Sequence, residues 1–160
     1  MRRLAAPALL AAALLLGARP APTPDLALLI EAGPEHEVRL TAADLGHFPQ
    51  AEERVSFEGE HGRTMATYSG VELWTLLEQA GGLGARPRDR VAKVLMATGR
   101  DGYTAALALG ELDSAFEGKE VLIANAADGH PMADGGLRLV VPGDQRGGRS
   151  ARDVARIVAR

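Results

Sequence analysis

The sequence predicts a single α+β domain with a mixed β-sheet and short helices. The chain has 160 residues, of which 46% are hydrophobic and 24% are charged, so it can build one core. Many short apolar or alternating runs, each bounded by glycine, proline or aspartate, are typical of strands. Apolar residues at helical spacing occur only in short stretches, which indicates that the strands dominate.

The N-terminus predicts a secretory signal peptide over residues 1–18. The basic start at Arg2-Arg3 precedes an uncharged apolar run that ends in small residues, and we expect cleavage after Ala18. Residues 19–25 are a proline-rich, extended spacer, and 26–160 form the mature domain. A buried helix and an uncleaved membrane anchor are the alternatives. The two arginines also invite a twin-arginine interpretation, but their neighbours favour ordinary Sec-type export.

The first elements are two strands and a short helix. Residues 26–32 and 37–41 lie on either side of a Gly33-Pro34 turn and predict strands. Thr41 and Asp44 have the spacing of a capping box, so a helix of little more than one turn should follow.

The clearest helix is predicted over residues 70–80. Ser69 and Glu72 have the form of a capping box, and a stripe of apolar residues follows at i, i+3, i+4 and i+7: Leu73, Leu76, Leu77 and Ala80. Before this helix, the alternation around Val55 and around 65–68 is broken by the glycines of 59–62, which predicts a hairpin or a strand, a loop and a second strand.

The second half of the chain is richer in strands. We expect strands over 91–97, 103–107, 121–124 and 137–141, with a short helical turn at 109–116; each segment is bounded by turn residues. The tail after Ser150 has two interpretations, a capped helix or a turn followed by a strand.

Charge and cysteine content exclude several classes of function. The formal net charge is -3, so no attraction to nucleic acid is expected. The chain contains no cysteine, which excludes disulfides, cysteine zinc sites, iron–sulfur clusters and thiol catalysis. No stable membrane span is expected in the mature form.

Two parts of the sequence carry residue types suited to a functional site. The four histidines are scattered, and His61, in a glycine-flanked loop, is a weak candidate metal ligand. Residues 143–152 hold three arginines, and Arg138 precedes them; guanidinium groups with free backbone N–H groups can bind phosphate or carboxylate. The alternative is a solvated loop held by ion pairs of Asp144 and Asp153.

Short motifs occur along the mature chain in a characteristic order. They are YSGVELWTLL from Tyr68, DGY from Asp101, LGEL from Leu109, DGHPM from Asp128, LRLVVPG from Leu137 and GGRSAR from Gly147. This ordered set resembles the oxidoreductase molybdopterin-binding domain family, which has the sulfite oxidase-like fold. The resemblance covers essentially the whole mature chain and implies an α+β fold that holds a pterin cofactor in a pocket.

The resemblance also implies roles for individual residues. Arg138 matches an arginine before the VVPG strand, and Arg149, Ser150 and Arg152 match a phosphate-binding segment of the family. Tyr103 matches an aromatic residue near the metal. The family's tail is a turn followed by a strand.

The chain departs from the family at the metal. Family enzymes hold molybdenum through one cysteine thiolate in the loop near Glu58–Gly62, and this chain has no cysteine to offer. Molybdopterin therefore stays a candidate cofactor, direct molybdenum–thiolate ligation is excluded, and the sequence leaves open whether the chain is an enzyme.

Two functional hypotheses follow. The first is an exported molybdopterin-dependent oxidoreductase-like domain, periplasmic or secreted, with a membrane redox partner. The second is a non-catalytic periplasmic module that uses the same fold to bind a small anion or to assist another protein. A metal-binding protein built around His61 is a third, weaker hypothesis.

Overall fold

The computed structural model describes residues 26–59 and 61–160, so the predicted signal peptide and spacer lie outside the described residues. The elements are β1 (Leu26–Glu31), β2 (Glu37–Thr41), α1 (Ala42–Leu45), β3 (Ala51–Gly59), β4 (Gly62–Glu72), α2 (Leu73–Ala80), α3 (Pro87–Arg90), β5 (Val94–Gly99), β6 (Thr104–Ala108), α4 (Leu109–Leu112), β7 (Leu122–Ala127), β8 (His130–Pro131), η1 (Ala133–Gly135), β9 (Arg138–Val140), η2 (Gly147–Arg149) and β10 (Val154–Ala159). Within the described part, no helix is long and apolar enough to cross a membrane.

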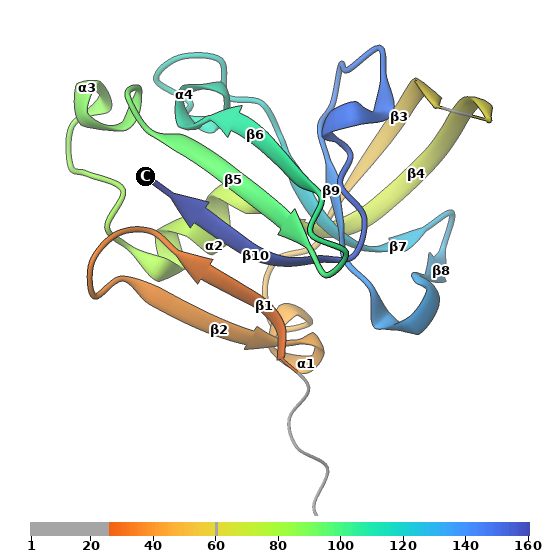
Figure 1. Ribbon diagram of the computed structural model, residues 1–160, viewed down its shortest axis with the longest axis horizontal. Helices are drawn as coiled ribbons and strands as arrows, with labels where there is room; N and C mark the ends of the chain where they lie inside the picture. The colour runs from red at the N-terminus through yellow and green to blue at the C-terminus, as the bar shows by residue number, and fades with distance from the viewer. Residues whose placement is uncertain (1–25, 60) are drawn as a thin grey trace, which may run out of the picture.

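The strands form two sheets (Figure 1). Sheet A has the order β2-β1-β10-β5-β6 and is mixed, because β1 and β10 pair in parallel while the other neighbours are antiparallel. Sheet B has the order β3-β4-β7-β8, with β9 also paired to β7, and is antiparallel. The α+β fold class is confirmed. Sheet A is the predicted mixed sheet, and sheet B is a second sheet next to it.

Two apolar clusters stabilise this arrangement. The larger lies between the sheets and includes the stripe of α2, whose Leu73, Leu76 and Leu77 are fully buried. The smaller lies on the other face of sheet B and contains Phe57 and Tyr68. Successive side chains of a strand point to opposite faces, so β7 and β9 contribute to both clusters.

The predicted start of the 70–80 helix is wrong. Strand β4 continues to Glu72, and α2 begins only at Leu73 without a side-chain cap. Gly70 explains the difference: a Cβ atom at this position would lie 2.2 Å from the Ile123 carbonyl oxygen, so this glycine is pressed against β7 as a strand residue. The Ser69 hydroxyl donates to Glu52 Oε1 at 3.1 Å and is not available as a helix cap.

Two boundaries in the middle of the chain also differ from expectation. The predicted 91–97 strand starts at Val94, because Pro87 opens the short helix α3 and Val91 follows it as an exposed residue. The helical turn predicted over 109–116 ends at Leu112. The tail is a turn followed by strand β10, as the family resemblance implies.

Other local predictions are confirmed. The Thr41 hydroxyl accepts from the Asp44 backbone N–H, and the Asp44 carboxylate accepts from the Thr41 N–H, so the predicted capping box is present. Strands β3 and β4 form the predicted hairpin, paired along its whole length from Gly59↔Gly62 to Ala51↔Gly70.

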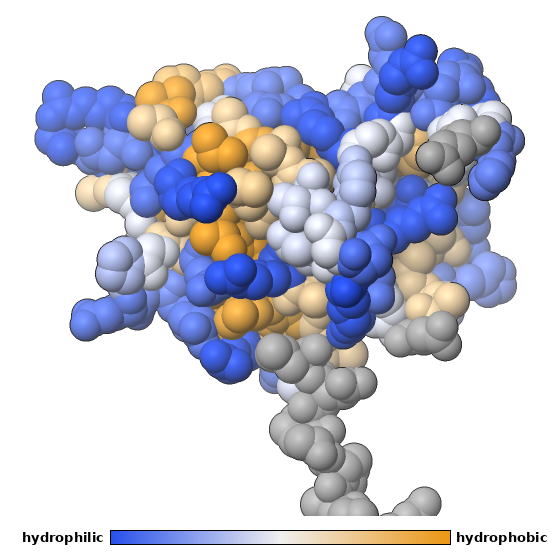
Figure 2. Space-filling model, in the orientation of Figure 1, coloured by the Kyte–Doolittle hydropathy of each residue, from blue (hydrophilic) through white to orange (hydrophobic). Residues whose placement is uncertain are grey.

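Polarity varies across the visible face of the molecule (Figure 2). Apolar side chains gather over β5 and the neighbouring strands of sheet A, whereas the end that carries the β3–β4 hairpin is hydrophilic. Val91, Val94 and Phe116 are exposed apolar residues on the sheet A side. The charged groups that the sequence analysis selected in the C-terminal loop belong to the part of the fold that packs on sheet B.

Candidate functional site

The loop between β9 and β10 packs on sheet B and carries η2. Its Gly147 lies against the ring of Phe57, where a Cβ atom would be 2.7 Å from ring atom Cε2. A glycine is therefore needed for the loop to approach β3 this closely. Three residues further on, Ser150 is buried, and its hydroxyl donates to the Leu139 carbonyl oxygen at 3.0 Å.

Arg138 is held by aromatic rings and by this serine. Its guanidinium carbon lies 5.6 Å from the centroid of Phe57 and 5.3 Å from that of Tyr68, within the range of cation–π contacts. Its Nε donates to Ser150 Oγ at 2.9 Å. Burial lowers the pKa of Arg138 from its ordinary value, and the nearby charge of Arg152 acts in the same direction.

Arg152 lies beside Arg138, because the two residues form an antiparallel β-bridge. Its side chain is exposed. No ion pair found among the described residues includes either arginine. Two neighbouring cations without a carboxylate partner attract an anion. The structure thus brings the predicted residues Arg138, Ser150 and Arg152 together.

Arg149 has a different environment from these three. Its Nε and Nη2 donate to the two carboxylate oxygens of Asp144 at 3.0 and 2.6 Å. Its Nη1 donates to both oxygens of Glu111, at 3.1 and 2.9 Å. The hydrogen bond with Asp144, followed by that with Glu111, raises the pKa of Arg149 well above its ordinary range. Its positive charge is already compensated by two carboxylates.

Tyr103 reaches the same loop from sheet A. Its hydroxyl donates to the Gly148 carbonyl oxygen at 2.5 Å, and its backbone N–H donates to Asp101 Oδ1 at 2.9 Å. The ring is half exposed. Tyr103 therefore contacts the loop at Gly148, one residue after the glycine that lies against Phe57.

His61, the weak candidate metal ligand, is an exposed residue at the end of the β3–β4 hairpin. In the described part of the chain its side chain forms no hydrogen bond or ion pair. Nor do the described residues contain a group of three or more histidine, cysteine, aspartate or glutamate side chains placed to hold a metal ion. Over residues 26–59 and 61–160, His61 therefore belongs to no such group.

The alternative of a loop held by ion pairs is correct for Asp144, which binds Arg149 at 2.6 Å. Asp153 pairs instead with Arg100, outside the loop, at 2.5 Å. The ion pairs of the loop thus occupy Arg149 and leave Arg138 and Arg152 to other partners.

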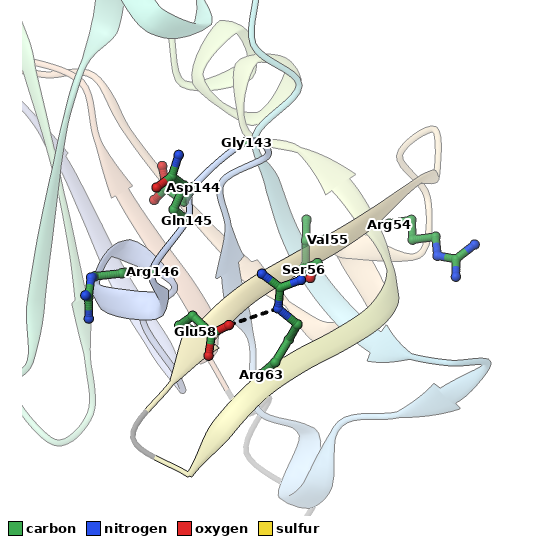
Figure 3. Close-up of a pocket in the computed structure, with 9 residues that line it drawn as sticks. All are labelled: Arg54, Val55, Ser56, Glu58, Arg63, Gly143, Asp144, Gln145 and Arg146. Atoms are coloured by element: carbon green, nitrogen blue, oxygen red, sulfur yellow. Dashed lines mark hydrogen bonds and ion pairs between the residues drawn. The ribbon is translucent and has the colours of Figure 1, made fainter.

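A cavity of about 430 Å³ lies between the loop and the β3–β4 hairpin (Figure 3). Four of its lining residues belong to the 143–152 loop that the sequence analysis selected: Gly143, Asp144, Gln145 and Arg146. The other five come from the hairpin: Arg54, Val55, Ser56, Glu58 and Arg63. Arg63 donates to Glu58 Oε1 at 2.9 Å, and Figure 3 shows Arg54 turned away from the others. The Glu58 N–H donates to the Gln145 carbonyl at 2.9 Å and joins the two walls.

Sequence reasoning missed the aromatic pair around Arg138 and the cavity wall from β3. The spacing of Phe57 and Tyr68 predicts only a hairpin. That both rings face one arginine depends on the pairing of β4 with β7 and of β7 with β9. Nothing in the sequence around Arg54 distinguishes it from an ordinary surface arginine.

Comparison with known proteins identifies the family. The sequence model described as "Oxidoreductase molybdopterin binding domain" matches residues 18–160. The chain belongs to this family. No curated protein matches it. Among solved structures it is similar to the sulfane dehydrogenase SoxCD from Paracoccus pantotrophus, with a TM-score of 0.68 and 24% identity. The match covers 85% of this chain and only 38% of the SoxCD chain, so it supports the sulfite oxidase-like fold.

The residues of this family member fit one part of a molybdopterin cofactor. Arg138 and Arg152 form no ion pair among the described residues, and the rings of Phe57 and Tyr68 lie close to the first. This arrangement suits the phosphate-bearing organic part. The residues do not fit the metal part as the family resemblance describes it, because the chain has no cysteine to supply a thiolate.

Proposed function

We propose that this chain is an exported domain that binds molybdopterin, or a similar organic anion, through Arg138 and Arg152. The observation that supports the proposal most is the position of Arg138, half-buried on sheet B without a carboxylate partner among the described residues. A buried charge without a counter-ion is costly, and a bound anion would offset that cost. Arg152, next to it and exposed, provides the second charge.

The neighbours of these arginines hold the first one in place. Ser150 accepts from Nε of Arg138 while its own hydroxyl donates to Leu139, so the serine fixes the guanidinium on one edge. The rings of Phe57 and Tyr68 lie within cation–π distance of the guanidinium group and limit its movement. A guanidinium oriented in advance loses less conformational entropy when it binds an anion.

Molybdopterin, when bound, supplies the metal-centred redox chemistry of the oxidoreductase family. We assign no reaction step to this chain, because no cysteine is present to hold the metal as the family does. Tyr103, which the resemblance places near the metal, stays a proposed contact to the cofactor or substrate.

Cofactor content tests the proposal directly. The protein would be produced in a host that makes molybdopterin, purified without denaturation, and analysed for molybdenum by mass spectrometry and for pterin by fluorescence after oxidation. Pterin at near one equivalent supports cofactor binding, with or without molybdenum. Absence of both from well-folded protein refutes the molybdopterin proposal.

A second candidate function is a non-catalytic module that binds a small anion or serves as an accessory protein. The missing cysteine favours it, because it removes the metal ligand and leaves the fold intact. A thermal-shift screen of anions tests it. A rise in Tm with sulfate or phosphate, reduced in Arg152→Ala, supports the module. If no anion stabilises the parent protein, an anion-binding role is refuted and only a partner-binding one is left.

Export and a membrane redox partner belong to the same proposal. Residues 1–18 support export by their basic start and apolar run. The mass of protein recovered from the periplasm of an expressing bacterium tests it: loss of residues 1–18 supports a cleaved signal, and full-length protein in the cytoplasm refutes it.

A further inference from the structure

Arg149 connects the loop to a distant element. Asp144, its first partner, lies in the same loop, five residues earlier, whereas Glu111 belongs to α4, next to sheet A. The Arg149 side chain is two-thirds buried, and the carboxylates of Asp144 and Glu111 are more buried still, with 17% and 22% of each side chain exposed. These three residues are called the clamp below.

Glu111 is fixed independently of the loop. Its Oε1 accepts from the Ala108 backbone N–H at 3.1 Å, and its Oε2 accepts from Lys119 Nζ at 3.1 Å. The clamp therefore connects the glycine-rich 143–149 loop to Glu111, a residue that is already held by other contacts. Loops of this kind move more readily than the helices and strands they join. The hydrogen bond from Tyr103 to Gly148 ties the same loop to the start of β6.

We propose that Arg149 is a positioning residue, and that the clamp holds the 143–149 loop so that Ser150 and Arg152 stay in place beside Arg138. This inference rests on the proposed anion-binding function. The chain continues directly from Arg149 into Ser150, whose N–H donates back to the Gly147 carbonyl at 3.0 Å. Movement of η2 is thus passed to the serine that orients Arg138 and to Arg152 just beyond it.

The hydrogen bonds of Arg149 indicate that it positions the loop and does not contact the anion itself. They donate to four carboxylate oxygens, and a ligand would have to compete with two carboxylates for the same guanidinium. Arg138 and Arg152 have no such competitors among the described residues. A loop that is ordered before binding spares the anion the cost of ordering it.

Glu111→Gln distinguishes the two roles by the sign of its effect. The substitution removes a negative charge close to the site and partly releases Arg149. If Arg149 contacts the anion, both changes tighten binding. If the clamp positions the loop, binding weakens in spite of the more favourable net charge. We expect sulfate to bind about 3- to 10-fold more weakly, the range for losing the order of one or two side chains.

The experiment titrates sulfate into the full-length mature protein by calorimetry at low ionic strength, for the parent, Glu111→Gln, Asp144→Asn and the control Glu37→Gln. Asp144→Asn breaks the other half of the clamp, so the test stands if Glu111→Gln does not fold. Glu37 is an exposed carboxylate on β2 paired with Arg39, and its variant controls for the loss of one negative charge away from the loop. Hydrogen exchange of the 143–150 amides is followed in the same proteins.

Weaker sulfate binding with faster exchange of the 143–150 amides in the clamp variants, and parent behaviour in Glu37→Gln, supports the inference. Unchanged or tighter binding in the clamp variants overturns it. If the parent binds no sulfate, the proposed anion site fails. Faster exchange in the clamp variants then still supports the clamp as a loop anchor, and unchanged exchange overturns that as well.

Discussion

Gly70→Ala should destabilise the protein severely, because the backbone of β7 leaves no room for a Cβ atom at Gly70. An added Cβ would lie 2.2 Å from the Ile123 carbonyl oxygen and 2.5 Å from Ala124 Cα. These are backbone atoms, so no side-chain rotation relieves the overlap. Restoring ordinary contact of about 3.4 Å requires a shift of about 1 Å in β7, which is paired on its other side with β8 and β9.

We expect a loss of at least about 3 kcal/mol, at the upper end of what single overpacking substitutions cost. For a domain of this size such a loss lowers Tm by roughly 10 °C. Gly148→Ala is the matched control, because its Cβ would meet no atom within 4 Å, and it should change stability by less than about 0.5 kcal/mol.

Urea denaturation of the three proteins, with a shared m-value, measures the differences. If Gly70→Ala unfolds within about 1 kcal/mol of the parent, the pairing of β4 with β7, and with it the arrangement that places Tyr68 over Arg138, is refuted.

Three further predictions concern the loop, a buried ion pair and the core. Gly147→Ala forces a Cβ to 2.7 Å from the Phe57 ring and should cost about 1–3 kcal/mol and weaken sulfate binding; equal affinity in the folded variant would contradict the packing described. Arg90 donates to Asp113 at 2.5 Å and lowers the pKa of that buried carboxyl. The ion pair therefore stabilises the fold fully above the unfolded pKa of about 3.9, and this stabilisation is lost as pH falls through the lower pKa of the folded state. Asp113→Asn should therefore lower Tm at pH 7 and have a smaller effect near pH 3. A difference in Tm between parent and variant that is as large at pH 3 as at pH 7 would count against this ion pair. Leu76→Ala, in the fully buried stripe of α2, should cost about 2–5 kcal/mol by urea denaturation, and a cost below about 1 kcal/mol would show that α2 does not pack as described.

The fold could be predicted from the sequence where local signals agree with tertiary packing. The apolar stripe of α2 and the Thr41 capping box are local patterns, and both are confirmed. The start of α2 was missed because Ser69 and Glu72 have capping-box spacing while Gly70 is held in β4 by its contact with β7. A contact between strands that are distant in the chain leaves no local signal, and it overrode the local preference.

The candidate site, like the fold, could be predicted only in part from the sequence. A cluster of arginines is visible in the sequence, and the family resemblance selects among them. The sequence cannot distinguish Arg149, paired with two carboxylates, from Arg138 and Arg152, because Glu111 comes to Arg149 from α4. The stacking of Arg138 on Phe57 likewise depends on strand order in sheet B.

The central claim is that Arg138 and Arg152 together form an anion site. Calorimetric titration of sulfate into the parent, Arg152→Ala and Arg86→Ala at low and high salt tests it most directly. Arg86 is an exposed arginine paired with Asp89 on α3, and its variant controls for loss of one positive charge. The account predicts one saturable site in the parent that weakens as salt screens the charges, a loss of about 10-fold or more in Arg152→Ala, and parent affinity in Arg86→Ala. Equal affinities in the parent and Arg152→Ala, or no binding to the parent, would contradict the claim.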